Sequence, residues 1–401
     1  MAARPWLAVV IELSARPDPE GAAVAQAART CFRPLLRVLA RQRHAAVTLA
    51  VDPSLARLLL RHGHAGVLQE VVAAAERGQV ELAGGARNHA LLPRLPRREV
   101  ERQIRLGHEE MREAMGRSWR PQGLLPPALA WSRHVGEVAA DRGMRWVLAD
   151  ELALGRLGLA PRHRVATLRG RPDALLYFRD RLVSQRLARG EDLGLDRGDG
   201  YRVAVVPGVA FCEGSAAIAG LERLLAGDGP MLTALSALAS AFPDREPVEP
   251  LPSSWRTTQE ELASGIPFAA WSAPDNEVHA LLWRLVALGL AEAERLAATE
   301  PGTAAYTRMR TLLDEGLHTA PFRFASGRPW WQPEVVREAA RRLGGALEAS
   351  PELVAPEVRE EAALLLRRID EALAAWERHR TPDRLWPGPA AAEADAAELA
   401  G

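Results

Sequence analysis

The sequence GQVELAGGARNHALLP, from Gly78 to Pro93, is the stretch on which the interpretation of the whole chain depends. Val80 and Leu82 alternate with Glu81, which predicts a short strand with one polar face. The strand is expected to end at Gly84-Gly85, where the backbone can turn sharply or lie close to a ligand. Barrel enzymes present polar groups to a substrate in this way, at the ends of their strands.

The same alternation of apolar strands and amphipathic helices continues on both sides of this stretch. Strands are expected at residues 6–13, 45–51, 123–127, 145–150, 174–180 and 201–206, with helices at 21–43, 54–61, 66–77, 97–115 and 132–142 between them. This order of elements indicates an α/β barrel or a doubly wound sheet. About seven strands before residue 210 favour an incomplete (β/α)7-type barrel.

From residue 215 onward, helical segments dominate the sequence, at 216–226, 231–242, 276–299, 302–317, 332–348 and 356–379. We therefore predict a barrel domain at 1–214 and a C-terminal helical bundle at 215–380 that packs on the barrel. The tail at 381–401 is rich in Pro, Ala and Glu and has no hydrophobic period, so it is expected to be disordered.

Composition excludes several classes of partner and cofactor. Lys+Arg and Asp+Glu both number 51, so no net field favours nucleic acid or an acidic membrane. Cys31 and Cys212 are far apart in the sequence without C-x-x-C spacing, and the N-terminus has no signal-peptide core. Both features predict a soluble, cytoplasmic protein with reduced cysteines. His62-Gly63-His64 has no accompanying carboxylate constellation and no nucleotide loop is present, so neither metal nor cofactor is expected.

The stretch at 78–93 resembles the second sequence region of glycoside hydrolase family 57, whose relatives act on α-glucans. Segments similar to later family elements follow in order at 103–150, 178–184, 251–283 and 325–331, so the resemblance spans roughly residues 6–348. It implies a protein of carbohydrate metabolism whose partner is an α-glucan oligosaccharide or polysaccharide.

The resemblance also identifies the positions at which the family carries its catalytic pair. The nucleophilic Glu of the third region corresponds to Pro127, and the acid/base Asp of the fourth region corresponds to Pro207. Proline supplies neither an acid nor a nucleophile, and retaining glycosidases need two carboxyl groups. The expectation is a catalytically impaired, carbohydrate-binding or regulatory homologue.

Two alternatives remain open at this point. The carboxylates could have moved, with Glu12, Glu81 and Glu213 as relocated candidates near strand ends, which would give an active glycosidase or transglycosylase. Alternatively, the cleft could be closed by apolar residues, which would leave a structural or interaction protein. The candidate substrate-binding residues come from the matched segments and from aromatic loop positions: Glu81, Gly84, His89, Trp131, Asp180, Trp255 and Trp330. For Asp180 helix capping is the competing role, and for the tryptophans it is packing.

Overall fold

The computed structural model describes residues 4–14, 20–43, 46–195, 198, 200–227, 229–327 and 330–379. The tail predicted at 381–401 lies outside these residues. The described chain divides into two compact units, the first ending at Trp255 and the second beginning at Arg256. Residues 215–255, which the sequence analysis assigns to the helical domain, therefore belong to the first unit.

Seven strands of the first unit close into a barrel. They are β1 (Trp6–Leu13), β2 (Val47–Val51), β3 (Val80–Ala83), β4 (Gly123–Leu124), β5 (Trp146–Asp150), β7 (Arg171–Arg179) and β8 (Tyr201–Pro207). Parallel pairing runs through β3-β2-β1-β8 and through β7-β5-β4. The two sheets meet at a parallel bridge between Gly84 and Leu124, and at a hydrogen bond from Asp180 N to Val203 O of 2.8 Å. The predicted (β/α)7-type barrel is confirmed.

Side chains along the barrel strands alternate between two hydrophobic cores, because successive residues of a strand point to opposite faces. On β1, Leu7, Val9 and Ile11 pack in the core beneath the surrounding helices, whereas Ala8 and Val10 belong to the core inside the barrel. The same period places Glu12 on the inner face, at the C-terminal end of the strand. The sequence pattern thus directs a carboxyl group into the mouth of the barrel.

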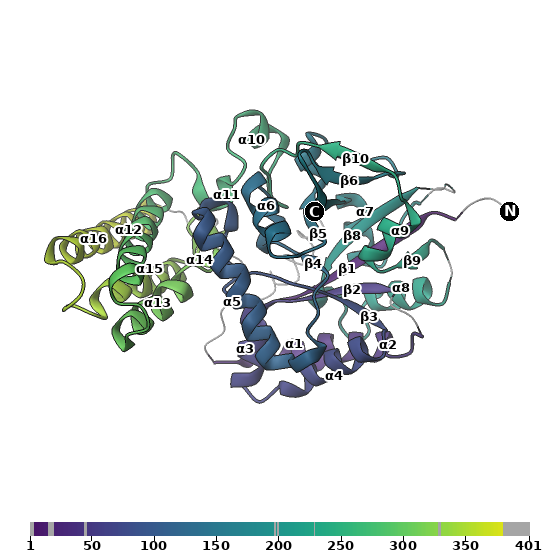
Figure 1. Ribbon diagram of the computed structural model, residues 1–401, viewed down its shortest axis with the longest axis horizontal. Helices are drawn as coiled ribbons and strands as arrows, with labels where there is room; N and C mark the ends of the chain where they lie inside the picture. Colours follow the sequence, from purple (N-terminus) through teal and green to yellow (C-terminus); the bar gives the residue numbers. More distant parts are fainter. Residues whose placement is uncertain are drawn as a thin grey trace. The chain divides into compact units, whose positions relative to one another are not determined.

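The helices around the barrel follow the predicted positions closely, except for α7 (Arg181–Arg189), which was not predicted. The others are α1 (Ala22–Ala27), η1 (Ala28–Phe32), α2 (Arg33–Leu39), α3 (Pro53–Arg61), α4 (Ala65–Glu76), α5 (Arg97–Met115), α6 (Arg133–Asp141) and α8 (Ala216–Leu225). Helices α1 to α4 cover one side of β1, β2 and β3 (Figure 1). The helix predicted at 21–43 contains a π-helical turn, η1, between its two α-helical parts.

Three short strands extend the sheets beyond the barrel: β6 (Val165–Leu168), β9 (Met231–Thr233) and β10 (Arg245–Val248). The helix predicted at 231–242 is wrong over its first part, because β9 pairs in parallel with the start of β1. Only η7 (Leu235–Ala237) and α9 (Leu238–Ala241) are helical in this segment. A tertiary partner here overrides the helix propensity of an Ala- and Leu-rich sequence.

The two cysteines form a disulfide, which corrects the expectation that they are reduced. Cys31 lies in η1 and Cys212 follows the turn after β8, at a sequence separation of 181 residues. Beside the disulfide, Glu213 N donates a hydrogen bond of 2.7 Å to Thr30 O. The loop after β8 is therefore attached to η1 by a covalent bond and a backbone hydrogen bond.

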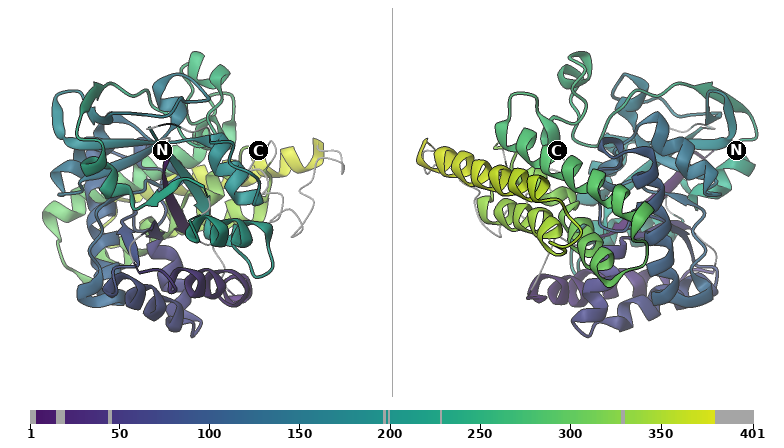
Figure 2. Two further views of the ribbon diagram at one scale, coloured as in Figure 1. Left: turned by 90° about the vertical axis from the view of Figure 1, so that its right-hand side faces the viewer. Right: turned by 60° about the vertical axis from the view of Figure 1, so that its left-hand side comes forward.

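The second unit is helical. It contains α10 (Gln259–Ala263), α11 (Ala269–Ser272), α12 (Glu277–Thr299), α13 (Ala304–Gly316), α14 (Thr319–Phe324), α15 (Pro333–Glu348) and α16 (Pro356–His379). The long helices of this unit, coloured green to yellow, run side by side in Figure 2. Gly316 allows α13 and α15 to approach closely, because a Cβ there would lie 2.5 Å from Leu343. None of the helices in the described part of the chain is long and apolar enough to span a bilayer.

One buried histidine organises the start of α12. Asn276 caps the helix by accepting a hydrogen bond of 2.9 Å from His279 N. The His279 ring accepts at Nδ1 from Ala273 N (3.0 Å), and its Nε2 lies 2.8 Å from Phe322 O. Both ring nitrogens are thus satisfied by a neutral imidazole, and burial lowers the pKa of His279 to about 4.

Candidate functional site

A pocket opens at the C-terminal ends of β1 to β4, where barrel enzymes place their active sites. Its lining residues come from four successive strands and the loops that follow them: Glu12, Ala50, Val51, Asp52, Gly84, Gly85, His89, Leu125 and Pro127. The pocket is small: the volume open to the centre of a water molecule is about 10 Å³, which is room for about one water.

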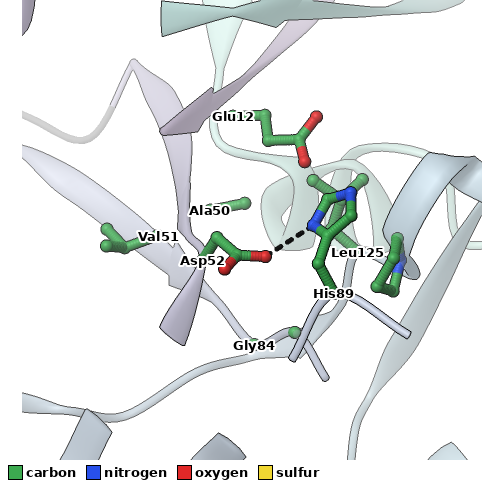
Figure 3. A pocket seen from close by; sticks show the side chains of 9 residues that line it. Glu12, Ala50, Val51, Asp52, Gly84, His89 and Leu125 are labelled. Carbon is green, nitrogen blue, oxygen red and sulfur yellow. Dashed lines mark hydrogen bonds and ion pairs between the residues drawn. The ribbon is translucent and has the colours of Figure 1, made fainter. Parts of the chain in front are cut away.

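Asp52 and His89 form a close pair in this pocket. Asp52 follows β2 and caps α3, its Oδ1 accepting a hydrogen bond of 2.7 Å from Ser54 N. Its other oxygen, Oδ2, lies 2.6 Å from His89 Nδ1 (Figure 3). Because a carboxylate accepts, Nδ1 carries the proton in this contact, and Nε2 is the ring's other position for proton exchange.

His89 reaches Asp52 from a backbone conformation that is unusual for a residue with a side chain. Its φ is 51°, in the left-handed region, and Ala128 and Leu129 beside the pocket residue Pro127 have φ values of 57° and 47°. Such conformations cost free energy and persist where the surrounding structure enforces them, often at functional sites. Within the described chain these three residues are the non-glycine positions with positive φ.

Glu12 completes the polar lining of the pocket. Its carboxyl group points toward the imidazole of His89 (Figure 3). Burial raises the pKa of Glu12; the positive fields of His89 and Arg179 oppose this rise, and the negative field of Asp52 adds to it. A carboxyl group with a raised pKa holds its proton to a higher pH, which suits it to proton transfer.

Both positions at which the family resemblance expects a catalytic carboxylate are prolines, one in the lining of the pocket and one on the strand next to Glu12. Pro127 lines the pocket. Pro207 ends β8 and is the direct register partner of Glu12 on β1. The side chains that could act on a ligand here are therefore Glu12, Asp52 and His89. Glu12 lies on β1, and Asp52 and His89 lie in the segments that follow β2 and β3.

Glu81, predicted as a substrate contact and as a relocated partner of Glu12, does not line the pocket. It pairs in register with Thr48, whose hydroxyl donates a hydrogen bond of 3.0 Å to Oε1, and it accepts from Ser236 N at 3.3 Å. Burial raises the pKa of Glu81, and the bonds from Ser236 and Thr48 oppose the rise. These contacts attach η7 to the barrel wall, which is a structural role.

The remaining predicted carboxylates lie elsewhere in the first unit. Asp180 caps α7 by accepting from Val183 N at 2.9 Å, and it forms an ion pair with Arg202. Glu213 is exposed, with its carboxylate 3.9 Å from Arg37. Of the predicted site residues, the structure brings together Glu12, Gly84 and His89 with Pro127.

The predicted aromatic contacts are packing residues. Trp131 is completely buried, and its indole donates to Pro250 O at 3.3 Å. Trp255 packs against the core inside the barrel. Trp330 lies in the second unit, buried, with the Arg323 guanidinium 4.8 Å from its ring centroid. The packing alternative therefore fits all three indoles.

A second polar group, centred on the fully buried Asp150, lies at the ends of β5 and β7. Asp150 accepts a hydrogen bond of 2.9 Å from Arg181 Nε, and its other oxygen is 3.8 Å from Arg179 Nη1. Asp150 also caps η5 (Glu151–Leu154) by accepting a hydrogen bond of 3.1 Å from Leu152 N. Burial lowers the pKa of Arg179, while Asp150 opposes this. Opposite charges here neutralise one another inside the protein.

Asp52 is a site residue that was not predicted from the sequence. The available signal was its position, directly after a buried strand and before Pro53, at the edge where the other strand-end groups gather. Its partner His89 is 37 residues away, so no local pattern joins them. Among the described residues, no group of three or more His, Cys, Asp or Glu side chains is placed to hold a metal ion.

Comparisons with known proteins give one family match. Residues 25–193 match the family model of glycosyl hydrolase family 57. Alpha-amylase 1 of Dictyoglomus thermophilum is 23% identical over 211 residues, which are 51% of this chain and 26% of that relative. The chain thus spans about a quarter of the length of this curated relative.

Solved structures of low identity share the fold. The branching enzyme of Thermococcus kodakaraensis has a TM-score of 0.68 at 13% identity, over 96% of this chain and 97% of that chain. The 4-alpha-glucanotransferase of Thermococcus litoralis has a TM-score of 0.61 at 13% identity, over 85% of this chain and 58% of that chain. At these identities the structures establish the architecture alone.

Proposed function

We propose that this chain, whose residues 25–193 match the family model of glycosyl hydrolase family 57, binds an α-glucan without performing the family's retaining hydrolysis. The ligand would be an oligosaccharide or a polysaccharide that contacts Glu12, Asp52 and His89 at the C-terminal ends of the strands. The protein is thus a carbohydrate-binding or regulatory homologue, impaired in the reaction that the family's carboxylate pair supports.

One observation carries the proposal: the positions at which the resemblance expects the two carboxylates are Pro127, which lines the pocket, and Pro207, which is the register partner of Glu12. Retaining hydrolysis needs a nucleophilic carboxylate and an acid/base carboxyl group about 5–5.5 Å apart. Asp52, the other carboxylate of the pocket besides Glu12, is committed to His89 at 2.6 Å and to the N-terminus of α3. Neither proline can replace the missing groups.

The choice of an α-glucan rests on the relatives. The similar proteins described above are an alpha-amylase, a branching enzyme and a 4-alpha-glucanotransferase. The pocket offers carboxylate oxygens, which accept hydrogen bonds, and an imidazole, which can donate one, and sugar hydroxyls make bonds of both kinds.

The cytoplasmic location expected from the sequence relied in part on reduced cysteines. Because Cys31 and Cys212 are bonded to each other, the proposal does not depend on that compartment.

A second candidate, an active glycosidase with relocated carboxylates, is supported only at Glu12. The partner expected for it, Glu81, is bonded to Thr48 and Ser236 outside the pocket. A purely structural role with a closed cleft is less favoured, because three polar side chains still line an open pocket.

Calorimetric titration with maltoheptaose and glycogen, together with chromatographic analysis of products, tests the proposal. We expect saturable binding, weakened at least tenfold in His89→Asn, with no release of reducing sugar and no transfer products. The surface variant Glu109→Gln should bind like the wild type, because Glu109 is exposed and contacts Arg105 on its own helix. Absence of binding, or release of reducing sugar with retained anomeric configuration, would refute it.

A further inference from the structure

We propose that the Cys31–Cys212 disulfide is a reversible redox switch, which an external dithiol opens by attack on the sulfur of Cys212. In the oxidised protein the disulfide attaches residues 212–215, between β8 and α8, to the π-helical turn η1. In the reduced protein these residues are free to separate from η1. The inference requires neither binding nor turnover of a carbohydrate, so its test is independent of the proposed function.

The unequal burial of the two cysteines gives the reaction its direction. Cys31 is 5% exposed and packs in the core beneath the helices, whereas Cys212 is only partly buried. Cys212 is followed by Glu213, whose side chain is 71% exposed. Thiol–disulfide exchange depends on the access of the attacking thiolate to one of the two sulfurs. The accessible side of the bond is therefore Cys212, which makes Cys31 the leaving thiol.

The surroundings of the two sulfurs suit the reduced state as well as the oxidised one. Thr30 Oγ1 lies 3.4 Å from Cys31 Sγ and donates its own proton to Gln26 O at 3.0 Å, so it can accept from a Cys31 thiol. Val209 O lies 3.0 Å from Cys212 Sγ and can accept from a Cys212 thiol. A donor released without an acceptor would cost free energy. Each thiol formed by reduction instead has an acceptor already in place.

Reduction proceeds in two exchange steps that balance. A thiolate of the external dithiol attacks Cys212 Sγ, the bond between the two protein sulfurs breaks, and its electron pair remains on Cys31 Sγ, which takes up a proton. The second thiol of the reductant then loses its proton and attacks the reductant's own sulfur in the mixed disulfide. Cys212 leaves with the electron pair and takes up a proton. The protein gains two electrons and two protons, and the dithiol becomes a disulfide.

Reduction leaves the barrel closed, because other contacts hold the chain before Cys212. The register of β8 with β1, from Trp6 to Glu12, is backbone pairing that does not involve the cysteines. Phe211 is completely buried in the core beneath the helices. Beyond it, the backbone hydrogen bond from Glu213 N to Thr30 O connects the segment to η1. The part that reduction loosens is therefore residues 212–215 and the π-helical turn opposite them.

Hydrogen exchange combined with maleimide labelling and mass spectrometry tests the proposal, in dithiothreitol buffers of stepped reducing strength and without denaturant. We expect the folded wild-type protein to be reduced reversibly, with two maleimides added per chain. Peptides that cover 28–32 and 212–215 should exchange about tenfold faster or more after reduction, because their local opening becomes less costly. Peptides from α5 serve as the control and should exchange at an unchanged rate. Reoxidation should restore slow exchange.

Single-cysteine variants test the direction of attack. The thiol of Cys212 in Cys31→Ser should react with N-ethylmaleimide about tenfold faster or more than the thiol of Cys31 in Cys212→Ser, because it is more accessible. Thr30→Val removes the acceptor beside Cys31 and should make the wild-type disulfide harder to reduce. Glu109→Gln is the matched surface control and should be reduced like the wild type.

Two results on the wild-type protein would overturn the proposal whether or not a variant folds. The first is a disulfide that dithiothreitol reduces only when the whole barrel unfolds, as read by exchange of the α5 peptides. The second is unchanged exchange at 212–215 after complete reduction. Equal labelling rates in the two single-cysteine variants would refute attack at Cys212. None of these results bears on carbohydrate binding, which calorimetry with maltoheptaose measures separately.

Discussion

The buried imidazole of His279 should make the stability of the second unit depend on pH in a way that can be calculated. In the folded state both ring nitrogens are engaged by a neutral ring, and burial lowers the pKa of His279 to about 4. In the unfolded chain the ordinary value is about 6.5. Between these two values the unfolded state binds more protons, so stability is complete above pH 6.5 and is lost as the pH falls toward 4.

The size of the effect follows from the difference between the two pKa values. They differ by about 2.5, and each pKa unit corresponds to about 1.36 kcal/mol, which gives a total loss of roughly 3.4 kcal/mol below pH 4. At pH 5 the loss is about 2 kcal/mol. His279 is 1% exposed, so solvent screening does not reduce this figure appreciably.

Urea titrations at pH 7.5 and pH 5, read by hydrogen exchange of peptides from α12, would measure this loss. In His279→Gln, whose side chain does not titrate, the pH-dependent loss should be smaller by about 2 kcal/mol than in the wild type. His318→Gln serves as the matched control, because His318 is only partly buried and caps the short helix α14. Equal pH dependence in the wild type and His279→Gln would refute the reasoning.

Three further predictions concern the first unit. Cys212→Ser removes a disulfide that closes a loop of about 180 residues, and the chain-entropy model gives such a bond up to about 5 kcal/mol of folding stability. The melting temperature of the variant should therefore be lower than that of the wild type and should not change when dithiothreitol is added. A wild-type protein that melts identically with and without reductant would contradict this prediction. Asp150→Asn leaves Arg179 and Arg181 without their buried counter-charge and should cost about 3–5 kcal/mol in urea denaturation, whereas Asp173→Asn at the exposed end of β7 should cost less than about 1 kcal/mol. Gly123→Ala puts a Cβ 2.1 Å from the Trp146 ring and should cost at least about 1–3 kcal/mol, while Gly345→Ala, with its nearest neighbour at 4.0 Å, should be neutral or stabilising in the same thermal melts.

Periodicity alone locates most elements of the barrel. The strand Trp6–Leu13 and the helix Arg97–Met115 occupy the ranges predicted for them, because each is long enough for its hydrophobic pattern to repeat several times. The strands β6, β9 and β10 have three or four residues and no repeat. β9 and β10 pair with strands distant in the sequence, β9 with β1 more than 200 residues earlier and β10 with β6, and β6 also pairs with the adjacent strand β7.

The residues of the site can likewise be divided into those that the local sequence identifies and those that it does not. Glu12 and His89 were identified from strand-end and loop positions, whereas Asp52 had the local pattern of an ordinary helix cap before Pro53. The contact between Asp52 and His89 depends on the left-handed backbone conformation of His89, and the local sequence does not predict that conformation. The disulfide was missed for a related reason, since only the closing of the barrel brings Cys212 to Cys31.

The pairing of β1 with β8 has a consequence for how the protein is made. β1 is synthesised first, yet the register of Glu12 with Pro207 cannot form until residue 207 has left the ribosome. Until then one edge of an entirely apolar strand, Leu7 to Ile11, has no neighbour in the growing chain. A nascent chain halted before β8 should therefore be recognised by chaperones that bind exposed strand edges, and release should coincide with the emergence of Tyr201–Pro207 and the arrival of Cys212 beside Cys31.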